Sequence, residues 1–539
     1  MALARISTAY VACHRAAGTA RPPAALWLPA LVVAAVVALP MGYLALRALG
    51  AGSEAWDLIV RPRTLDIVVR SVLLVMAVTG ASVVIAVPLA WLTARTDLPL
   101  RGVWSVLTAL PLVIPSYVGA FLMIVALGPR GMVQGMLSPL GVDRLPDIYG
   151  FPGAMLALTL LSYPYVLLPV RAALGHMDPS LEETSRSLGR GPWGTFFRVT
   201  LPLLRPAIAA GALLVALYTL SDFGAVSLMQ YETFTWAIYI QYGYFARSLA
   251  AVLSLVLMAI ALGILLLEAV TRGRSQYYRD TAGALRPVNR VRLGPWRWPA
   301  VALCSALIML TLAMPMSVLG YWVARGVSAG EPLLLLWVHA RNSLYISGLA
   351  ALVGVAASLP IAIMVVRYPG KASALLERAS YTGFALPGVV VALAMVFFGV
   401  RYFTPLYQSL GLLLFAYVVL FLPAAMGAAK ASLLQVSPRL EEAARGLGRT
   451  PFQVFVTITL PLIRPGILAG AAMVFLLTMK ELPATLILSP IGFGTLATAV
   501  WSATEDGFFA QAAAPALLLI LASSVPMAFL ILRRVRVKQ

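Results

Sequence analysis

A polar, charged segment occurs twice in this chain, in otherwise apolar surroundings. The first copy reads LEETSRSLGR over residues 181–190 and continues to LPLLRP at residues 201–206. The second reads LEEAARGLGR over residues 440–449 and continues to LPLIRP at residues 460–465. Because 61% of the residues are hydrophobic, the repeat indicates a duplicated membrane protein that keeps one water-facing element in each half. We expect such an element to be a docking site.

The apolar stretches between the polar segments predict an all-α polytopic membrane protein. About twelve of them approach the roughly 20 residues that a helix needs to cross the hydrocarbon core. Only helices can satisfy their own backbone across so many crossings. The first apolar run is too long for a signal peptide, so we interpret it as a span. The expected spans begin near Trp27, Ile67, Trp104, Pro152, Pro206, Ala250, Pro299, Ser343, Ser380, Ser409, Pro465 and Gln511.

The net charge of +20 is explained by membrane topology. With the N-terminus inside, about 29 of the 40 Lys and Arg residues fall on cytosolic segments, as the positive-inside rule expects. The basic residues are spread over short loops, so we expect contact with anionic lipid and no nucleic-acid binding. Both termini are then predicted to be cytoplasmic.

The duplication divides the chain into two six-helix halves, residues 1–271 and 299–539, joined by a basic cytosolic linker at 272–298. Ser71 and Pro88 recur as Ser343 and Pro360. An even number of spans per half gives both halves the same orientation, so the repeat is parallel. The two polar segments then lie on the same side of the membrane, where a symmetric partner could engage both.

Within each polar segment, a short helix is predicted to end at a glycine. Gly189 and Gly448 stand where a left-handed cap would close that helix. The prolines that follow are expected to end one element and begin the next span; they are Pro202, Pro206, Pro461 and Pro465. A well-capped connector would also fit, but it gives no reason to repeat charge, glycine and proline together.

The second copy, Glu442-Ala443-Ala444 followed by Gly448 and a hydrophobic-Leu-Pro, resembles the signature loop of membrane subunits of ATP-binding cassette importers. The first copy is looser, with Thr184 and Ser185 in place of the alanines. The resemblance covers essentially the whole chain and implies the type I importer permease fold. It also implies that each loop forms a coupling helix that docks into an ATPase subunit. The residues implied in docking are Glu182, Glu183, Gly189, Arg190, Glu441, Glu442, Gly448 and Arg449.

The resemblance further implies the partners: two copies of a cytosolic ATPase, a periplasmic binding protein and the bilayer of a bacterial inner membrane. The chain lacks a phosphate-binding loop, since Gly370-Lys371-Ala372 is only a fragment of one. It is therefore expected to be no enzyme and to bind no cofactor, with ATP used by the partner subunits.

Three ionisable residues are candidates for the translocation path. Asp222 and Glu481 occupy equivalent repeat positions inside predicted spans, and Lys480 precedes the second. A charge at mid-bilayer costs about 2.5 to 3.5 kcal/mol on insertion scales, so these residues are expected to face water or the interface between halves. A structural ion pair or an anchor at a helix break remains an equal alternative. No stable metal site is expected, because the cysteines and histidines lack ligand spacing.

The segments around Lys480–Thr485 and Gly492–Thr498, with the fused halves, resemble the ferric-iron branch of these permeases. Iron(III) is a hard cation that favours oxygen ligands, which is compatible with the two carboxylates. Permeases for thiamine, sulfate, molybdate, polyamine and phosphonate share the same loop and remain alternatives. A transporter driven by an ion gradient is the alternative from another class, because parallel six-span halves also occur there.

Overall fold

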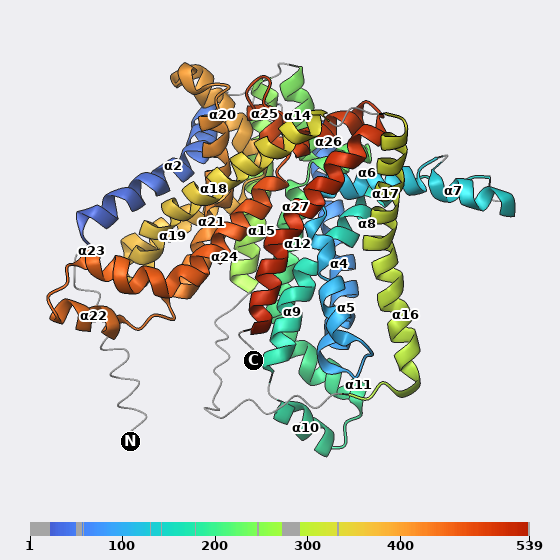
Figure 1. Ribbon diagram of the computed structural model, residues 1–539, viewed down its shortest axis with the longest axis horizontal. Helices are drawn as coiled ribbons and strands as arrows, with labels where there is room; N and C mark the ends of the chain where they lie inside the picture. Colours follow the sequence, from blue (N-terminus) through green and yellow to red (C-terminus); the bar gives the residue numbers. More distant parts are fainter. Residues whose placement is uncertain are drawn as a thin grey trace. The chain divides into compact units, whose positions relative to one another are not determined.

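The computed structural model describes residues 22–49, 57, 59–129, 131–141, 143–177, 179–244, 247–271, 291–330 and 334–536. The first 21 residues and most of the predicted linker lie outside these residues. The described chain is helical, with one isolated bridge between Thr96 and Val291 outside the helices. The all-α prediction is confirmed (Figure 1).

Eleven helical segments of the described chain are long and apolar enough to cross a membrane. They are Ala24–Leu44, Pro62–Arg95, Ser116–Leu140, Phe151–Gly175, Trp193–Ser221, Leu249–Leu267, Gly294–Ser328, Leu336–Arg367, Leu410–Leu433, Pro451–Met479 and Phe509–Ala528. The span expected near Ser380 is instead two shorter helices, α19 (Lys371–Ala385) and α20 (Gly388–Tyr402).

The interruption between α19 and α20 has a local cause at Leu386-Pro387. Leu386 has φ −86° and ψ 126°, the extended conformation that a following proline imposes. The equivalent Leu110-Pro111 lies in a short 3₁₀ helix, η1 (Leu110–Val113), between α5 (Arg101–Leu107) and α6 (Ser116–Leu127). The repeat therefore preserves a break in the same place in both halves.

The described chain forms two compact units that differ from the two sequence halves. One unit combines α2 (Ala24–Leu49), the first span of the first half, with α18 (Leu334–Arg367), α19 and α20 of the second half. The other combines the rest of the first half with α16 (Arg297–Ile308), η5 (Met309–Ala313) and α17 (Met314–Ser328). Thus α17 packs on α6, and η5 packs on α8 (Phe151–Ser162). The division of the chain into two repeated halves therefore differs from its division into two compact units.

Each unit is built on the same three-helix core. In the first-half unit, α4 (Pro62–Arg95), α9 (Pro164–His176) and α12 (Leu201–Ser221) pack pairwise. In the other unit, α18, α21 (Leu410–Leu433) and α24 (Leu460–Met479) do the same. The remaining helices of the first-half unit include α7 (Met132–Leu137), α10 (Pro179–Ser187), α11 (Pro192–Thr195), α13 (Gly224–Leu228), α14 (Phe234–Gly243) and α15 (Arg247–Thr271). Those of the other unit include α22 (Pro438–Gly446), α23 (Pro451–Val454) and α25 (Pro483–Leu488). Two helices, α26 (Leu496–Glu505) and α27 (Phe509–Arg536), are shared between the units along the chain.

Equivalent glycines allow the core helices to approach closely. A Cβ atom at Gly211 of α12 would lie 2.6 Å from the Cα of Val166 in α9. At Gly470 of α24 it would lie 3.2 Å from the Cα of Ala425 in α21. Small residues at such crossings permit the close van der Waals packing that holds helices together in lipid, where the hydrophobic effect does not drive their association.

The end of the linker is fastened to the loop after α4. Asp97 accepts hydrogen bonds from Leu293 N–H (2.9 Å) and from the Arg297 guanidinium (3.3 Å). Val291 N–H donates to Arg95 C=O, and Val291 C=O accepts from Asp97 N–H. The hydrogen bond from Leu293 lowers the pKa of Asp97. Because the pKa is lowered, this contact contributes its full stability above the ordinary pKa of aspartate. The contribution is lost only as the pH falls through the lowered pKa, so the contact is intact at neutral pH.

We predict that Asp97→Ala releases this end of the linker. Trypsin should then cut at Arg292 several times faster at neutral pH, because the segment loses the acceptor that holds Leu293. Asp143→Ala, in an exposed loop elsewhere in the same unit, is the matched control. Equal cleavage in the two variants, measured on the purified full-length protein by mass spectrometry, would refute the fastening role.

Candidate functional site

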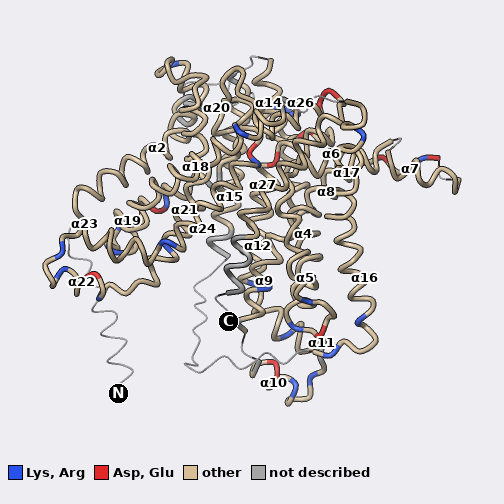
Figure 2. The backbone as a smooth tube through the Cα atoms, in the orientation of Figure 1, with Lys and Arg blue, Asp and Glu red and all other residues tan. Residues whose placement is uncertain are grey.

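The two repeated polar segments form short helices that lead into spanning helices. The helix α10 is followed by α11 and a π-helical turn, η3 (Phe196–Thr200), which continues into α12. In the same way α22 leads through α23 and η7 (Phe455–Thr459) into α24. Both helices carry a glutamate in the first turn and an arginine in the last, the signs that the helix dipole favours. These charges stand out against the apolar spans (Figure 2).

The glycine caps are confirmed. Gly189 has φ 80° and Gly448 has φ 85°, in the left-handed region that favours glycine. Arg190 N–H donates to Ser185 C=O, and Arg449 N–H donates to Ala444 C=O. Together with the bond from each glycine to the carbonyl three residues earlier, these form a Schellman motif at both helix ends.

The expected role of the prolines is wrong in one respect. Helical structure begins at Pro192 and Pro451, well before Pro202 and Pro461, so these prolines do not separate two elements. In each copy a π-helical turn ends just before the first proline, and that proline occupies the first turn of the following α-helix. A proline lacks an N–H and cannot donate to the helical turn before it, and the π-helical turn lies at this place in both copies.

The first glutamate of each pair turns toward the protein. Thr200 at the end of η3 donates its hydroxyl to Glu182 Oε1 at 2.9 Å. Thr459 at the end of η7 donates to Glu441 Oε1 at 3.0 Å. Glu441 is 7% exposed, which is rare for a glutamate without partners. These contacts tie each short helix to the base of a spanning helix.

An arginine from the end of α4 or α18 joins each glutamate. Arg367 Nη2 lies 2.8 Å from Glu441 Oε1 and donates to Val436 C=O at 3.1 Å. Arg95 interacts electrostatically with Glu182 and donates to Met177 C=O at 3.4 Å. Sequence reasoning missed both arginines. Their equivalent positions in the repeat are the signal that could have identified them.

Of the two residues that replace the alanines in the first copy, Ser185 faces the protein interior, whereas Thr184 is exposed. Ser185 is 5% exposed, and its hydroxyl lies 3.2 Å from that of Thr195 in α11. At the equivalent positions the second copy has Ala444 and Val454, both buried. The first copy thus has a pair of hydroxyl groups where the second copy has two buried apolar side chains.

The outer face of each segment presents apolar side chains beside its charges. Leu188 is 76% exposed and Leu447 is 85% exposed, and both stand next to a cap glycine. Such exposed apolar residues, framed by charge, are typical of protein interaction sites. Glu183, Arg190, Glu442 and Arg449 are exposed on the same segments. Further exposed apolar residues on these segments include Leu181, Trp193, Leu440 and Phe452.

The candidate path residue Asp222 directly follows α12, and Lys480 and Glu481 directly follow α24. Asp222 Oδ1 accepts the N–H groups of Ala225 (2.9 Å) and Val226 (3.3 Å) at the start of α13. Glu481 Oε1 accepts the N–H of Ala484 (3.0 Å) at the start of α25. Each carboxylate therefore binds backbone groups that a helix start leaves without intrahelical partners. This geometry matches the helix-break alternative and leaves a role in passage open.

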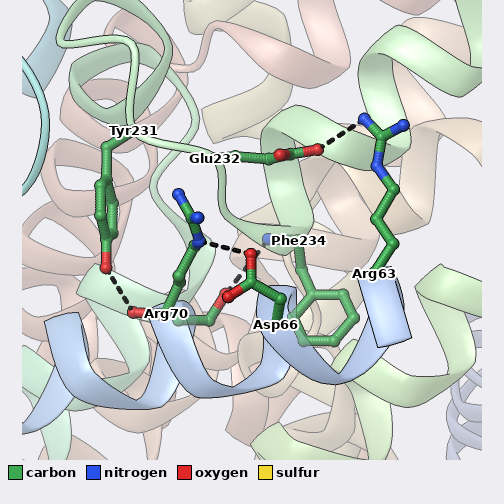
Figure 3. A network of polar contacts seen from close by, with 7 residues as sticks. Arg63, Asp66, Arg70, Tyr231, Glu232 and Phe234 are labelled. Atoms are coloured by element: carbon green, nitrogen blue, oxygen red, sulfur yellow. Dashed lines mark hydrogen bonds and ion pairs between the residues drawn. The ribbon is translucent and has the colours of Figure 1, made fainter. Parts of the chain in front are cut away.

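The segment beyond α13 is held against α4 by a polar network (Figure 3). Arg63 pairs with Glu232 at 2.9 Å, and Arg70 pairs with Asp66 at 2.6 Å. The hydroxyl of Tyr231 donates to the carbonyl of Arg70 at 3.2 Å. This bond and the Arg63–Glu232 pair connect the segment after α13 to α4.

A serine in each half completes this contact. Ser71 Oγ accepts the N–H of Phe234, the first residue of α14, at 3.2 Å. Ser343 Oγ accepts the N–H of Leu496, the first residue of α26, at 2.8 Å. The sequence marked these serines as repeat positions without giving them a role. In the described residues, no cluster of three or more His, Cys, Asp or Glu side chains could hold a metal ion.

Comparison with known proteins places this duplicated architecture in a family. The model of the family "Binding-protein-dependent transport system inner membrane component" matches twice, at residues 86–276 and 350–536. The chain is 37% identical over 513 residues to the Fe(3+)-transport system permease protein FbpB 2 of Haemophilus influenzae, covering 94% of this chain and 97% of the relative. It is 26% identical to the ferric transport system permease protein FbpB of Actinobacillus pleuropneumoniae, over 81% of this chain and 67% of that protein.

A shorter match joins the chain to another branch. The molybdenum transport system permease protein ModB of Escherichia coli (strain K12) is 34% identical over 29% of this chain and 69% of its own length. Two family matches in one chain confirm the duplication inferred from the polar segments. This chain therefore belongs to the inner membrane components of binding-protein-dependent transport systems, as a multi-pass permease subunit of an ATP-driven importer and not its ATPase.

Proposed function

We propose that the chain imports ferric iron that a periplasmic binding protein delivers. The observation that carries the proposal is the alignment with an Fe(3+)-transport permease over 94% of the chain. The molybdenum permease aligns over only 29%. The fused halves and the two carboxylates at the helix breaks are compatible with a hard cation, which favours oxygen ligands. The family assignment leaves the gradient-driven alternative without support.

The outer faces of α10 and α22 are proposed to dock two copies of the ATPase. The support is the combination of an exposed leucine, an exposed second glutamate and a glycine cap in each copy. The inner faces hold the short helices to the base of α12 and α24, so a displacement of either short helix would also displace the spanning helix to which it is bonded. This arrangement is what a coupling element requires.

The orientation that follows has both polar segments and both termini in the cytoplasm. It counts the interrupted pair α19 and α20 as one crossing in addition to the eleven long spans. The excess of Lys and Arg in the short loops assigned to the cytoplasm supports it. The sequence halves 1–271 and 299–539, with their linker at 272–298, remain our proposed division of the repeat.

The path itself is proposed to pass Asp222, Lys480 and Glu481. The support is that each acid ends a spanning helix at an equivalent repeat position. Because the carboxylates already bind N–H groups, contact with the cargo would be transient. Most selectivity would then reside in the binding protein.

Reconstituted uptake tests the cargo. Liposomes containing the permease, its ATPase and the iron-loaded binding protein should take up labelled iron when ATP is supplied. The same liposomes with a molybdate-, sulfate- or thiamine-loaded binding protein should show only background uptake and basal hydrolysis. Strong stimulation by one of those ligands, with iron inactive, would contradict the iron proposal and retain the permease assignment.

The docking role predicts that Gly448→Ala and Gly446→Ala have different effects on ATPase binding. Gly448→Ala forces a side chain into a left-handed conformation, at about 1 to 2 kcal/mol, and should weaken ATPase binding about fivefold or more. Gly446→Ala lies within α22, where an added Cβ meets no atom within 4 Å, and should change the affinity less than about twofold. Affinities measured on the permease in nanodiscs that agree for both variants would exclude the docking role.

The path role predicts a loss of uptake when only charge is removed. Asn at position 222 and Gln at position 481 still accept the backbone N–H groups but carry no charge. The double variant Asp222→Asn/Glu481→Gln should lower iron uptake roughly tenfold, about 1.4 kcal/mol of lost attraction.

The double alanine variant is the comparator, because it removes the hydrogen bonds as well as the charges. Protein level and ATPase binding are measured for both. Normal uptake in Asn/Gln with loss only in Ala/Ala would make the residues anchors of the helix breaks.

A further inference from the structure

The two neighbouring glutamates of each coupling segment point in different directions. Glu441 is 7% exposed, whereas Glu442 is exposed. In the first copy Glu182 is half-buried and Glu183 is exposed. Adjacent residues on a helix do not share a face, so only one of each pair can reach an external partner. The inner glutamate must serve the permease itself.

In the second copy, one carboxylate oxygen joins three elements. Glu441 Oε1 of α22 accepts from Arg367 Nη2 (2.8 Å) and Nε (3.2 Å) at the end of α18. It also accepts from Thr459 at the start of α24. The side chains of Arg367 and Glu441 are 13% and 10% exposed, so their attraction is little screened by water. These three residues, Arg367, Glu441 and Thr459, are called the second anchor below.

The first copy has the same residue types with fewer bonds. Glu182 accepts from Thr200. Arg95 has a buried Nε with no hydrogen-bond partner in the described structure, whereas the equivalent Nε of Arg367 donates to Glu441. Arg95, Glu182 and Thr200 are called the first anchor. A carboxylate that holds fewer donors restrains its helix less.

Two further contacts after each helix are unequal in the same sense, whereas the hydroxyl pair of Ser185 and Thr195 occurs only in the first copy. Thr450 and Gln453 form a capping box at the start of α23. The equivalent positions in the first copy are Gly191 and Gly194, which have no side chains to form one. Arg449 also donates to Thr457 at 2.7 Å, and the first copy places an arginine at the position equivalent to Thr457.

We propose that the second anchor makes α22 move as one body with α18 and α24, while the first anchor holds α10 more loosely. Glu441 is thus a positioning residue that transmits force from the ATPase, and the two coupling helices are mechanically unequal. The transmission step rests on the proposed docking function; the inequality in rigidity does not. A fused chain permits this inequality because each copy has its own residues.

Amide hydrogen exchange on the full-length permease in nanodiscs tests the inequality without any partner. The amides of residues 439–446 should exchange at least about tenfold more slowly than those of residues 180–187, because local opening must break the anchor. Glu441→Gln removes the ion pair and should bring the two helices to similar rates. Glu442→Gln, one residue away on the exposed face, is the matched control and should leave the difference. Equal rates in the unmodified protein would overturn the proposal.

Transport by the complete complex tests the transmission step. Glu441→Gln should lower the iron taken up per ATP hydrolysed at least about fivefold, the lower end of typical coupling between sites, while Glu182→Gln should lower it less than about twofold. If Glu441→Gln reduces the yield of folded permease on size exclusion, Thr459→Val and its counterpart Thr200→Val provide the same comparison with a smaller change. Equal losses in the two copies would refute unequal transmission. An unmodified complex that neither binds the ATPase nor imports iron would refute the proposed function, and the exchange result would still decide the inequality.

Discussion

The absence of water from the hydrocarbon core is the constraint on which the rest of this structure depends. Wherever a spanning helix stops inside the protein, the freed N–H groups of the next helix need a partner from the chain. Asp222 and Glu481 provide it at the starts of α13 and α25, and Ser71 and Ser343 provide it at the starts of α14 and α26. The permease can therefore contain short, re-directed helices between its spans. A path for a polar cargo needs such places, because continuous apolar helices offer none.

Much of the fold could be predicted from sequence because it is locally encoded. Hydropathy gives the spans, and the repeat gives the duplication. The left-handed positions of Gly189 and Gly448 follow from the residue type and its place after a short helix. The exposed polar segments were also foreseeable in outline, since charged residues in an apolar chain indicate contact with water.

The remaining features depend on contacts between distant residues. Arg367 and Glu441 are 74 positions apart, and no local pattern connects them. The helices that contain α12 and α24 both begin upstream of the expected starts near Pro206 and Pro465, because Arg205 and Arg464 lower the hydropathy just before these prolines. Nothing in α2 itself indicates that it packs with α18 and α19, helices more than 280 residues later in the sequence. Such features become visible only when the chain is folded.

Fusion of the two halves changes what symmetry demands of the permease. In a dimer of identical subunits, both coupling helices must have the same residues, so Thr457 could not face Arg449 in one copy while an arginine takes its place in the other. One chain removes that requirement. The shared elements here are those that lipid imposes, such as the glycine crossings and the serine and carboxylate partners at helix starts. The differing elements lie at the polar segments, where water satisfies the backbone and the residues are free to diverge. The duplicated chain thus retains symmetry where the membrane requires it and departs from symmetry within the polar segments, as at Ser185 against Ala444 and Gly191 against Thr450.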